Sequence, residues 1–141
     1  MAYVIVGVSG MIGALLRYFL GSFITHFWIQ DFPLSTLIIN LIGCFVLGGF
    51  TTHLARLDIL HPKLITGIGT GLIGSFTTFS TFSTETADLL QRSHWGAALL
   101  YLLLSLWGGL LFSWLGYKAG GAVFNLTRPD HANVDNKGET L

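Results

Sequence analysis

Charged side chains are scarce in this chain. Of its 141 residues, 10% are charged and 52% are hydrophobic, whereas soluble domains average about 25% charged residues. The seven basic residues balance the seven acidic ones, so the formal net charge is zero and nothing indicates nucleic-acid binding. This composition predicts a single domain that lies in a membrane rather than a soluble globular domain.

The chain has a single cysteine, and its first apolar stretch does not have the pattern expected of an export signal. The single cysteine, Cys44, stands inside an apolar stretch, so it cannot form an internal disulfide and makes no metal site by itself. A signal peptide requires Lys or Arg before its apolar stretch and a small-residue cleavage site after it. The sequence shows neither feature around its first apolar stretch. We therefore expect the first apolar stretch to remain in the protein.

The chain does contain four long apolar stretches. A helix needs about 20 mostly apolar residues to cross the hydrocarbon core of a bilayer, and the stretches at about 3–25, 34–54, 64–89 and 95–117 reach this length. The mean hydropathy is +0.67 and 18 residues are glycine, as in closely packed membrane helices. The sequence predicts an all-α membrane protein with one four-span domain at 1–125 and a disordered polar tail at 126–141.

The links between these stretches are short, so neighbouring spans are expected to run antiparallel, with both chain ends on one side of the membrane. Leaving out the far tail, that side carries Arg56, Lys63 and Lys118, and the other side carries Arg92. Taken alone, this modest bias favours both termini in the cytoplasm.

Two polar residues stand inside the first two apolar stretches. Arg17 either extends to the membrane interface along its own stem or presents a cation to an anion path, and the sequence leaves both readings open. Asn40 must find partners for two donors and an acceptor. An interhelical hydrogen bond is the favoured interpretation for Asn40, and a donor aimed at a passing anion is the alternative.

The third stretch has an unusual composition. It contains glycines at 67, 69, 71 and 74, followed within ten residues by seven hydroxyl side chains: Ser75, Thr77, Thr78, Ser80, Thr81, Ser83 and Thr84. Close helix packing explains the glycines but not the hydroxyls. Because a helix breaks within a membrane only where its backbone is buried in protein or lines a wet cavity, we predict a functional break near Gly74 to Thr77.

Three further features belong to the last two stretches. Phe79 and Phe82 lie three residues apart and share a helix face, which is typical of ordinary packing but also allows two positive ring edges to face an anion. Tyr101 and Ser105 lie four apart on one face and extend a polar track. Glu85, near the end of the third stretch, is either an interface residue or a gate.

Together these residues resemble the CrcB/Fluc family of microbial fluoride channels. The stretch Gly74–Ser83, GSFTTFSTFS, is similar to the family's specific G-x-x-T-T-F-S-T-F signature. Asn40–Gly43, NLIG, resembles the family's second span, and Arg17 in GALLRY resembles its first. The resemblance runs from Tyr3 to about Tyr117 and excludes the tail.

The resemblance implies a passive, fluoride-selective channel that exports fluoride across the cytoplasmic membrane of a prokaryote. It implies an antiparallel homodimer with two chains inserted in opposite orientations, although family members that pair with a second gene product also exist. Equal insertion in both directions predicts little charge bias, which the modest excess of Lys and Arg on one side does not match.

The resemblance also implies roles for particular residues. The carbonyls of Gly74 and Thr77 from both chains would hold a structural sodium ion at the dimer centre. The expected anion pore comprises Asn40, Phe79, Phe82, Tyr101 and Ser105, with Arg17 and Glu85 near the vestibules.

Other functions fit the residues less well. A small multidrug-resistance transporter also has four short spans, but its proton exchange needs a carboxylate in span one, where this chain has Arg17. A membrane scaffold needs no array of hydroxyls and phenylalanines. An enzyme is not expected, because no His, Asp and Ser constellation stands at intramembrane depth.

Overall fold

The structure is a computed structural model that describes residues 2–28, 32–52, 65 and 67–127. Within these ranges the chain forms helices and no strand: α1 (Ala2–Phe27), α2 (Leu34–Thr52), η2 (Gly67–Ile73), α4 (Gly74–Phe76), α5 (Phe79–Gln91) and α6 (Trp95–Thr127). The predicted all-α class is therefore confirmed.

Three of the described helices are long and apolar enough to cross a membrane, at Tyr3–Phe27, Leu34–Thr52 and Trp95–Val123. The third predicted span is divided among the π-helical η2, α4 and α5, so it contains no single long helix. The fourth span, predicted at about 95–117 with a tail from 126, corresponds to α6, whose helix runs to Thr127. The rest of the predicted tail, 128–141, lies outside the described residues.

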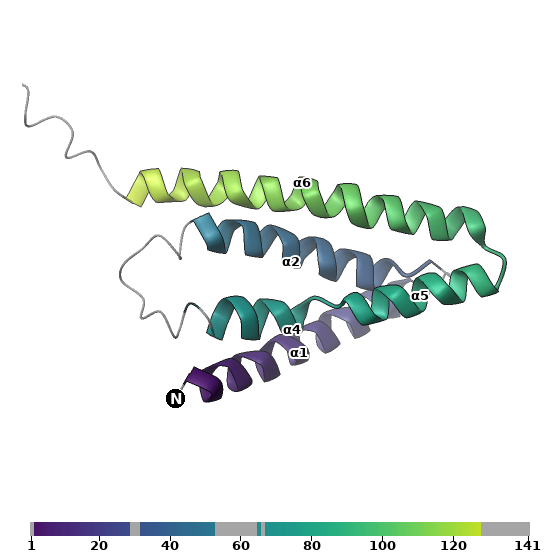
Figure 1. Ribbon diagram of the computed structural model, residues 1–141, viewed down its shortest axis with the longest axis horizontal. Coiled ribbons are helices and arrows are strands. Elements are labelled where there is room, and N and C mark those ends of the chain that lie inside the picture. The colour runs from purple at the N-terminus through teal and green to yellow at the C-terminus, as the bar shows by residue number, and fades with distance from the viewer. Residues whose placement is uncertain (1, 29–31, 53–64, 66, 128–141) are drawn as a thin grey trace, which may run out of the picture.

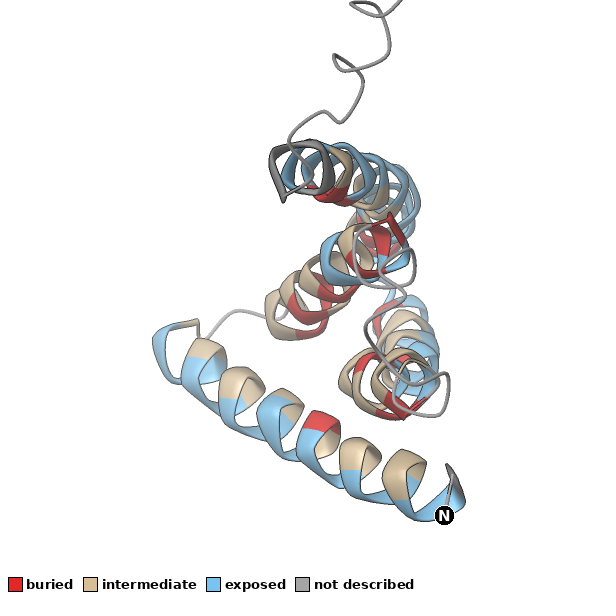
Figure 2. Ribbon diagram, turned by 90° about the vertical axis from the view of Figure 1, so that its left-hand side faces the viewer, coloured by how far each residue is buried: buried red, intermediate tan, exposed pale blue. Residues whose placement is uncertain are grey.

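The long helices lie side by side and form a bundle. Figure 1 shows α6, α2 and the η2–α4–α5 segment running along one another, with the start of α1, the end of α2 and the end of α6 at one end of the bundle. α2 packs mainly against α6, whereas α1 packs mainly against η2 and α4. Figure 2 shows α1 inclined across the other helices.

Few side chains are fully enclosed by the chain itself. The buried apolar cluster comprises Leu37, Leu89, Ala98 and Tyr101, while large apolar side chains along α1 and α6 are exposed. Figure 2 shows this as pale blue along the outer side of α1. Because contiguous exposed apolar surface marks contact with a membrane or a protein partner, lipid or a second chain must cover these faces.

Glycines bring the helix pairs into close contact. A methyl group at Gly48 would collide with the Ser113 carbonyl, and one at Gly116 with the Phe45 carbonyl, so α2 and α6 meet backbone to backbone. In the third span, Gly71 meets the Val6 carbonyl of α1 at a distance that no side chain permits. Small residues at helix contacts are the usual means of close packing in membranes, and this accounts for part of the glycine content of the third span.

We expect Gly116→Ala to destabilise the protein by about 1–3 kcal/mol, the usual cost of overpacking a close contact. Gly96→Ala in the same helix is the matched control, because a Cβ there meets no atom within 4 Å. Thermal unfolding in detergent measures both variants. Equal unfolding temperatures for the two would show that the α2–α6 contact is not close.

Candidate functional site

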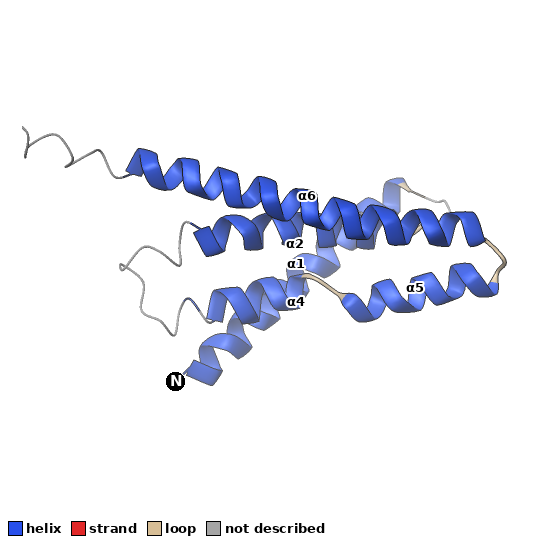
Figure 3. Ribbon diagram, turned by 45° about the horizontal axis from the view of Figure 1, so that its top comes forward, coloured by secondary structure: helices blue, strands red, loops and turns tan. Residues whose placement is uncertain are grey.

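The third span leaves helical conformation at two threonines. Thr77 (φ −79°, ψ 157°) and Thr78 (φ −145°, ψ 117°) are extended and join α4 to α5, as the loop between these helices in Figure 3 shows. The Thr78 hydroxyl accepts a hydrogen bond from the Thr81 N–H at 3.2 Å and so caps α5. The last carbonyls of a helix have no partners within it, which leaves the end of α4 as a set of acceptors.

Asn40 on α2 pairs with the backbone at this point. Its Nδ2 donates to the Thr78 carbonyl at 3.0 Å, and its Oδ1 accepts from the Thr78 N–H at 2.9 Å. The side-chain amide of Asn40 thus bonds the N–H and the carbonyl of Thr78, as the backbone of a neighbouring strand would. The favoured interpretation of Asn40, an interhelical hydrogen bond, matches these contacts, and one Nδ2 hydrogen is not used in them.

Several hydroxyls of the third span are bonded locally. Thr77 donates to the Ile73 carbonyl at 3.2 Å, Ser83 to the Phe79 carbonyl at 2.9 Å and Thr84 to the Thr81 carbonyl at 2.9 Å. Bonds of this kind satisfy a hydroxyl within its own helix. These three hydroxyls are therefore satisfied by carbonyls of their own span, so their presence does not by itself indicate an ion path.

Glu85 is held by hydroxyls from two other helices. Thr36 of α2 donates to its Oε1 and Tyr101 of α6 donates to its Oε2, both at 2.8 Å. The Tyr101 side chain is fully buried and Thr36 is 5% exposed. The sequence predictions included Glu85 and Tyr101 but missed Thr36, although its position four residues before Asn40 places both on one face of α2.

The aromatic residues form a row from the surface inward. Phe79 is 80% exposed, and its ring centroid is 5.8 Å from that of Phe82. Phe82 is in turn 5.0 Å from Tyr101. The two phenylalanines predicted to act together are therefore neighbours at the start of α5.

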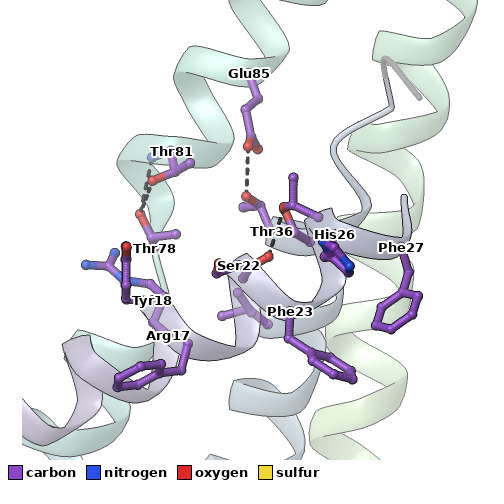
Figure 4. A pocket seen from close by; sticks show the side chains of 15 residues that line it. Arg17, Tyr18, Ser22, Phe23, His26, Phe27, Thr36, Thr78, Thr81 and Glu85 are labelled. Atoms are coloured by element: carbon purple, nitrogen blue, oxygen red, sulfur yellow. Dashed lines mark hydrogen bonds between the residues drawn. The ribbon is translucent and has the colours of Figure 1, made fainter. Parts of the chain in front are cut away.

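Two grooves lie on either side of the break. The first, of about 640 Å³, brings together six of the predicted residues and is lined mainly by apolar atoms; the six are Asn40, Gly74, Thr77, Phe79, Phe82 and Ser105. The second, of about 1020 Å³, lies among α1, α2 and α5 and contains Arg17, Thr36, Thr81 and Glu85 (Figure 4). Thr78 lines both grooves, whereas Tyr101 lies behind Phe82 and lines neither.

Arg17 is half-buried in the second groove. Figure 4 shows its guanidinium on the side where Thr78 lies. It makes no ion pair with another described residue, so the positive charge is available to the groove. Both readings of Arg17, a cation that faces an anion path and a side chain that extends to the interface, remain predictions.

No group of three or more His, Cys, Asp or Glu side chains suited to a metal occurs in the described part of the chain. The sodium ion that the family resemblance implies would bind backbone carbonyls, those of Gly74 and Thr77, and these residues lie at the start of α4 and directly after its end.

The family model described as "CrcB-like protein, Camphor Resistance (CrcB)" matches residues 4–117. The chain belongs to the CrcB family. The match covers all four predicted spans, so the resemblance inferred from the third-span motif is confirmed.

Relatives in the CrcB family carry a functional name. A protein named "Fluoride-specific ion channel FluC 1" from Bacillus cereus is 56% identical over 132 residues, which are 92% of each chain. "Fluoride-specific ion channel FluC 2" from Geobacillus kaustophilus is 47% identical over 84% of this chain and 92% of its own. "Fluoride-specific ion channel FluC 1" from Moorella thermoacetica is 50% identical over 79% of each chain.

Family membership and the apolar helices together make the chain a multi-pass protein of a prokaryotic cell membrane. The names of the relatives describe ion channels, which are not enzymes. They do not favour the multidrug transporter or the scaffold that the sequence left as alternatives.

Proposed function

We propose that this protein is a passive, fluoride-selective channel that exports fluoride from the cell, and that it works as an antiparallel dimer of two copies. The observation that carries the proposal is the first groove, where Asn40, Phe79, Phe82 and Ser105 meet beside the non-helical Thr77 and Thr78. The relatives named as fluoride-specific channels align with nearly the whole of this chain.

The groove has the chemistry that a small anion requires. The spare Nδ2 hydrogen of Asn40 and the Ser105 hydroxyl are donors, and the edges of the Phe79 and Phe82 rings carry partial positive charge. The N-terminus of α5 adds the positive end of a helix dipole close to Thr78. Such contacts are individually weak, and conduction needs several weak sites rather than one tight site.

A second copy of the chain supplies the missing wall. Phe79 is exposed, a methyl group added at Gly74 would meet no atom within 4 Å, and the first groove is open on one side. A pore with one open side would admit lipid, so the groove conducts only when another protein surface covers it. Two-fold pairing of the same surface is the commonest way to bury such a face, and opposite insertion of the copies gives two equivalent pores.

The break also offers backbone carbonyls that a sodium ion could bind. Gly74 lies in the last turn of the continuous η2–α4 helical segment and Thr77 follows that turn, where backbone acceptors lack helical partners and the helix dipole is negative. Unwound carbonyls of this kind coordinate Na⁺ near the middle of membrane transporters. Two such carbonyls from each chain would hold a sodium ion between the copies, and its charge would raise the local potential for an anion.

Removal of sodium should weaken the dimer and reduce fluoride transport. Protein purified and assayed with N-methylglucamine in place of sodium is expected to show a lower dimer fraction by crosslinking and a slower fluoride efflux, with recovery on adding sodium. Potassium is the ionic-strength control. An unchanged dimer and unchanged efflux without sodium would refute the structural ion.

Growth of a bacterium that lacks its own fluoride exporters tests the function in cells. Expression of this chain should restore growth at a fluoride concentration that stops the parent strain, because a passive anion pathway lets the membrane potential drive fluoride out. The same strain expressing Asn40→Leu, at equal protein level, is the matched control. Failure of the unaltered chain to restore growth would contradict the proposed function.

A further inference from the structure

A third phenylalanine ring lies behind the pair in the groove. Phe32 directly precedes Pro33 and the start of α2, and its ring centroid is 5.6 Å from that of Tyr101 in an edge-to-face arrangement of 77°. Phe82 contacts Tyr101 as well, at 5.0 Å and 52°. Tyr101 is thus packed against one ring from the α1–α2 connection and one ring from the groove.

Phe32 is itself fixed in place. Its carbonyl accepts hydrogen bonds from the Trp28 indole N–H at 3.1 Å and from the Leu34 N–H at 2.8 Å. Its side chain packs on the buried apolar cluster that includes Leu37 and Leu89. The end of α1 and the start of α2 therefore hold the Phe32 ring against Tyr101.

The polar end of Tyr101 depends on where this ring lies. Its hydroxyl donates to Glu85 Oε2 at 2.8 Å, and Thr36 donates to the other carboxylate oxygen. Hydrogen bonds weaken steeply as their geometry departs from linear, so a tilt of the Tyr101 ring would release one oxygen of Glu85. Glu85 also lines the second groove, where a freed carboxylate oxygen would repel an anion.

We propose that Phe32 is a positioning residue for fluoride permeation, which holds the Tyr101 ring so that the Tyr101 hydroxyl restrains the Glu85 carboxylate. Phe32 lines neither of the two grooves described above; it lines a smaller cavity of about 300 Å³ with Trp28 and Glu85, and the proposed effect runs through its ring contact with Tyr101. The proposal rests on the proposed channel function.

Phe32→Leu in liposomes is the first test. Loss of the edge-to-face contact is expected to lower the initial fluoride efflux rate roughly threefold to tenfold, the range that one aromatic pair supplies. Phe32→Tyr keeps the ring and should restore a rate close to that of the unaltered protein. Phe45→Leu is the control, since Phe45 is an exposed residue of α2 that lines neither groove.

Coupling to Tyr101 separates positioning from general stability. Tyr101→Phe removes the hydroxyl that Phe32 is proposed to position, so adding Phe32→Leu to Tyr101→Phe should cause little further loss. Independent effects multiply in such a cycle, whereas effects through a shared partner do not. A double variant as slow as the product of the two single effects would overturn the proposal.

The remaining outcomes are also decisive. If Phe32→Leu does not assemble, Trp28→Phe removes only the indole donor to Phe32, and a rate unchanged by this variant would overturn the proposal. An unchanged rate in a well-folded Phe32→Leu would do the same while leaving the channel function intact. Absence of fluoride efflux in the unaltered protein would instead refute the channel function and, with it, the role of Phe32.

Discussion

Asn40→Leu is expected to reduce fluoride efflux by about two orders of magnitude, because about 2.7 kcal/mol corresponds to a hundredfold change in rate. The substitution removes both partners of Thr78, whose N–H and carbonyl are bonded to Asn40. Each buried backbone group left without a partner costs about 1–3 kcal/mol. The extended residues between α4 and α5 would then rearrange to find other partners, which displaces Phe79 and the α5 N-terminus.

Initial rates from fluoride-loaded liposomes measure this effect. Thr51→Val is the matched control: Thr51 lies on the same helix but donates only to the Leu47 and Gly48 carbonyls of α2. Asn40→Asp adds a finer comparison, since it keeps an acceptor for the Thr78 N–H and loses the donor to the Thr78 carbonyl. Efflux at the unaltered rate in Asn40→Leu would show that the pairing does not hold the break in a conducting form.

Phe79→Ile and Phe82→Ile should each lower fluoride efflux about tenfold while leaving the dimer intact. Isoleucine keeps an apolar side chain but lacks the positive ring edge, and interactions of an aromatic ring are worth about 0.5–1.5 kcal/mol, up to roughly tenfold in rate. Phe79 is exposed in the single chain, so its replacement leaves the fold of one copy unstrained.

Fluoride efflux and dimer fraction are measured for both phenylalanine variants in the same preparation. Phe45→Ile provides the comparison for loss of a ring outside the grooves. Efflux at the unaltered rate in both Phe79→Ile and Phe82→Ile would remove these rings from the ion path. A loss of dimer that parallels the loss of efflux would instead assign them to the contact between copies.

The helical class was predictable because each apolar stretch is long enough to span a bilayer by itself. The close packing of α6 on α2 at Gly116 and Gly120, and the continuation of α6 to Thr127, could not be read from the sequence. Packing of this kind depends on the partner helix, so the hydropathy of one segment does not predict it.

The position of the extended residues shows the same limit. The sequence placed a break near Gly74 to Thr77; Thr77, the last residue of this range, and Thr78 are extended, and Gly74–Phe76 are helical. Glycine content indicated weak helix formation, but the residue that leaves the helix is fixed by tertiary partners. Asn40 binds the backbone of Thr78, and the Thr78 hydroxyl caps the next helix.

In the candidate site, the sequence predicted the residues that line the first groove but not the residues that contact and position them. Six predicted residues meet in the first groove, while Tyr101 lies behind it and donates to Glu85. Thr36 and Phe32 were missed because a single threonine and a single phenylalanine near a span end are common in membrane helices. Only their contacts with Glu85 and Tyr101 distinguish them.

Anion efflux from liposomes that contain only this protein tests the central claim most directly. Vesicles loaded with potassium fluoride should release fluoride when valinomycin lets potassium follow, as an electrogenic channel requires, and matched vesicles loaded with potassium chloride should release little chloride. Chloride release as fast as fluoride release, or no fluoride release above that of protein-free vesicles, would contradict the account.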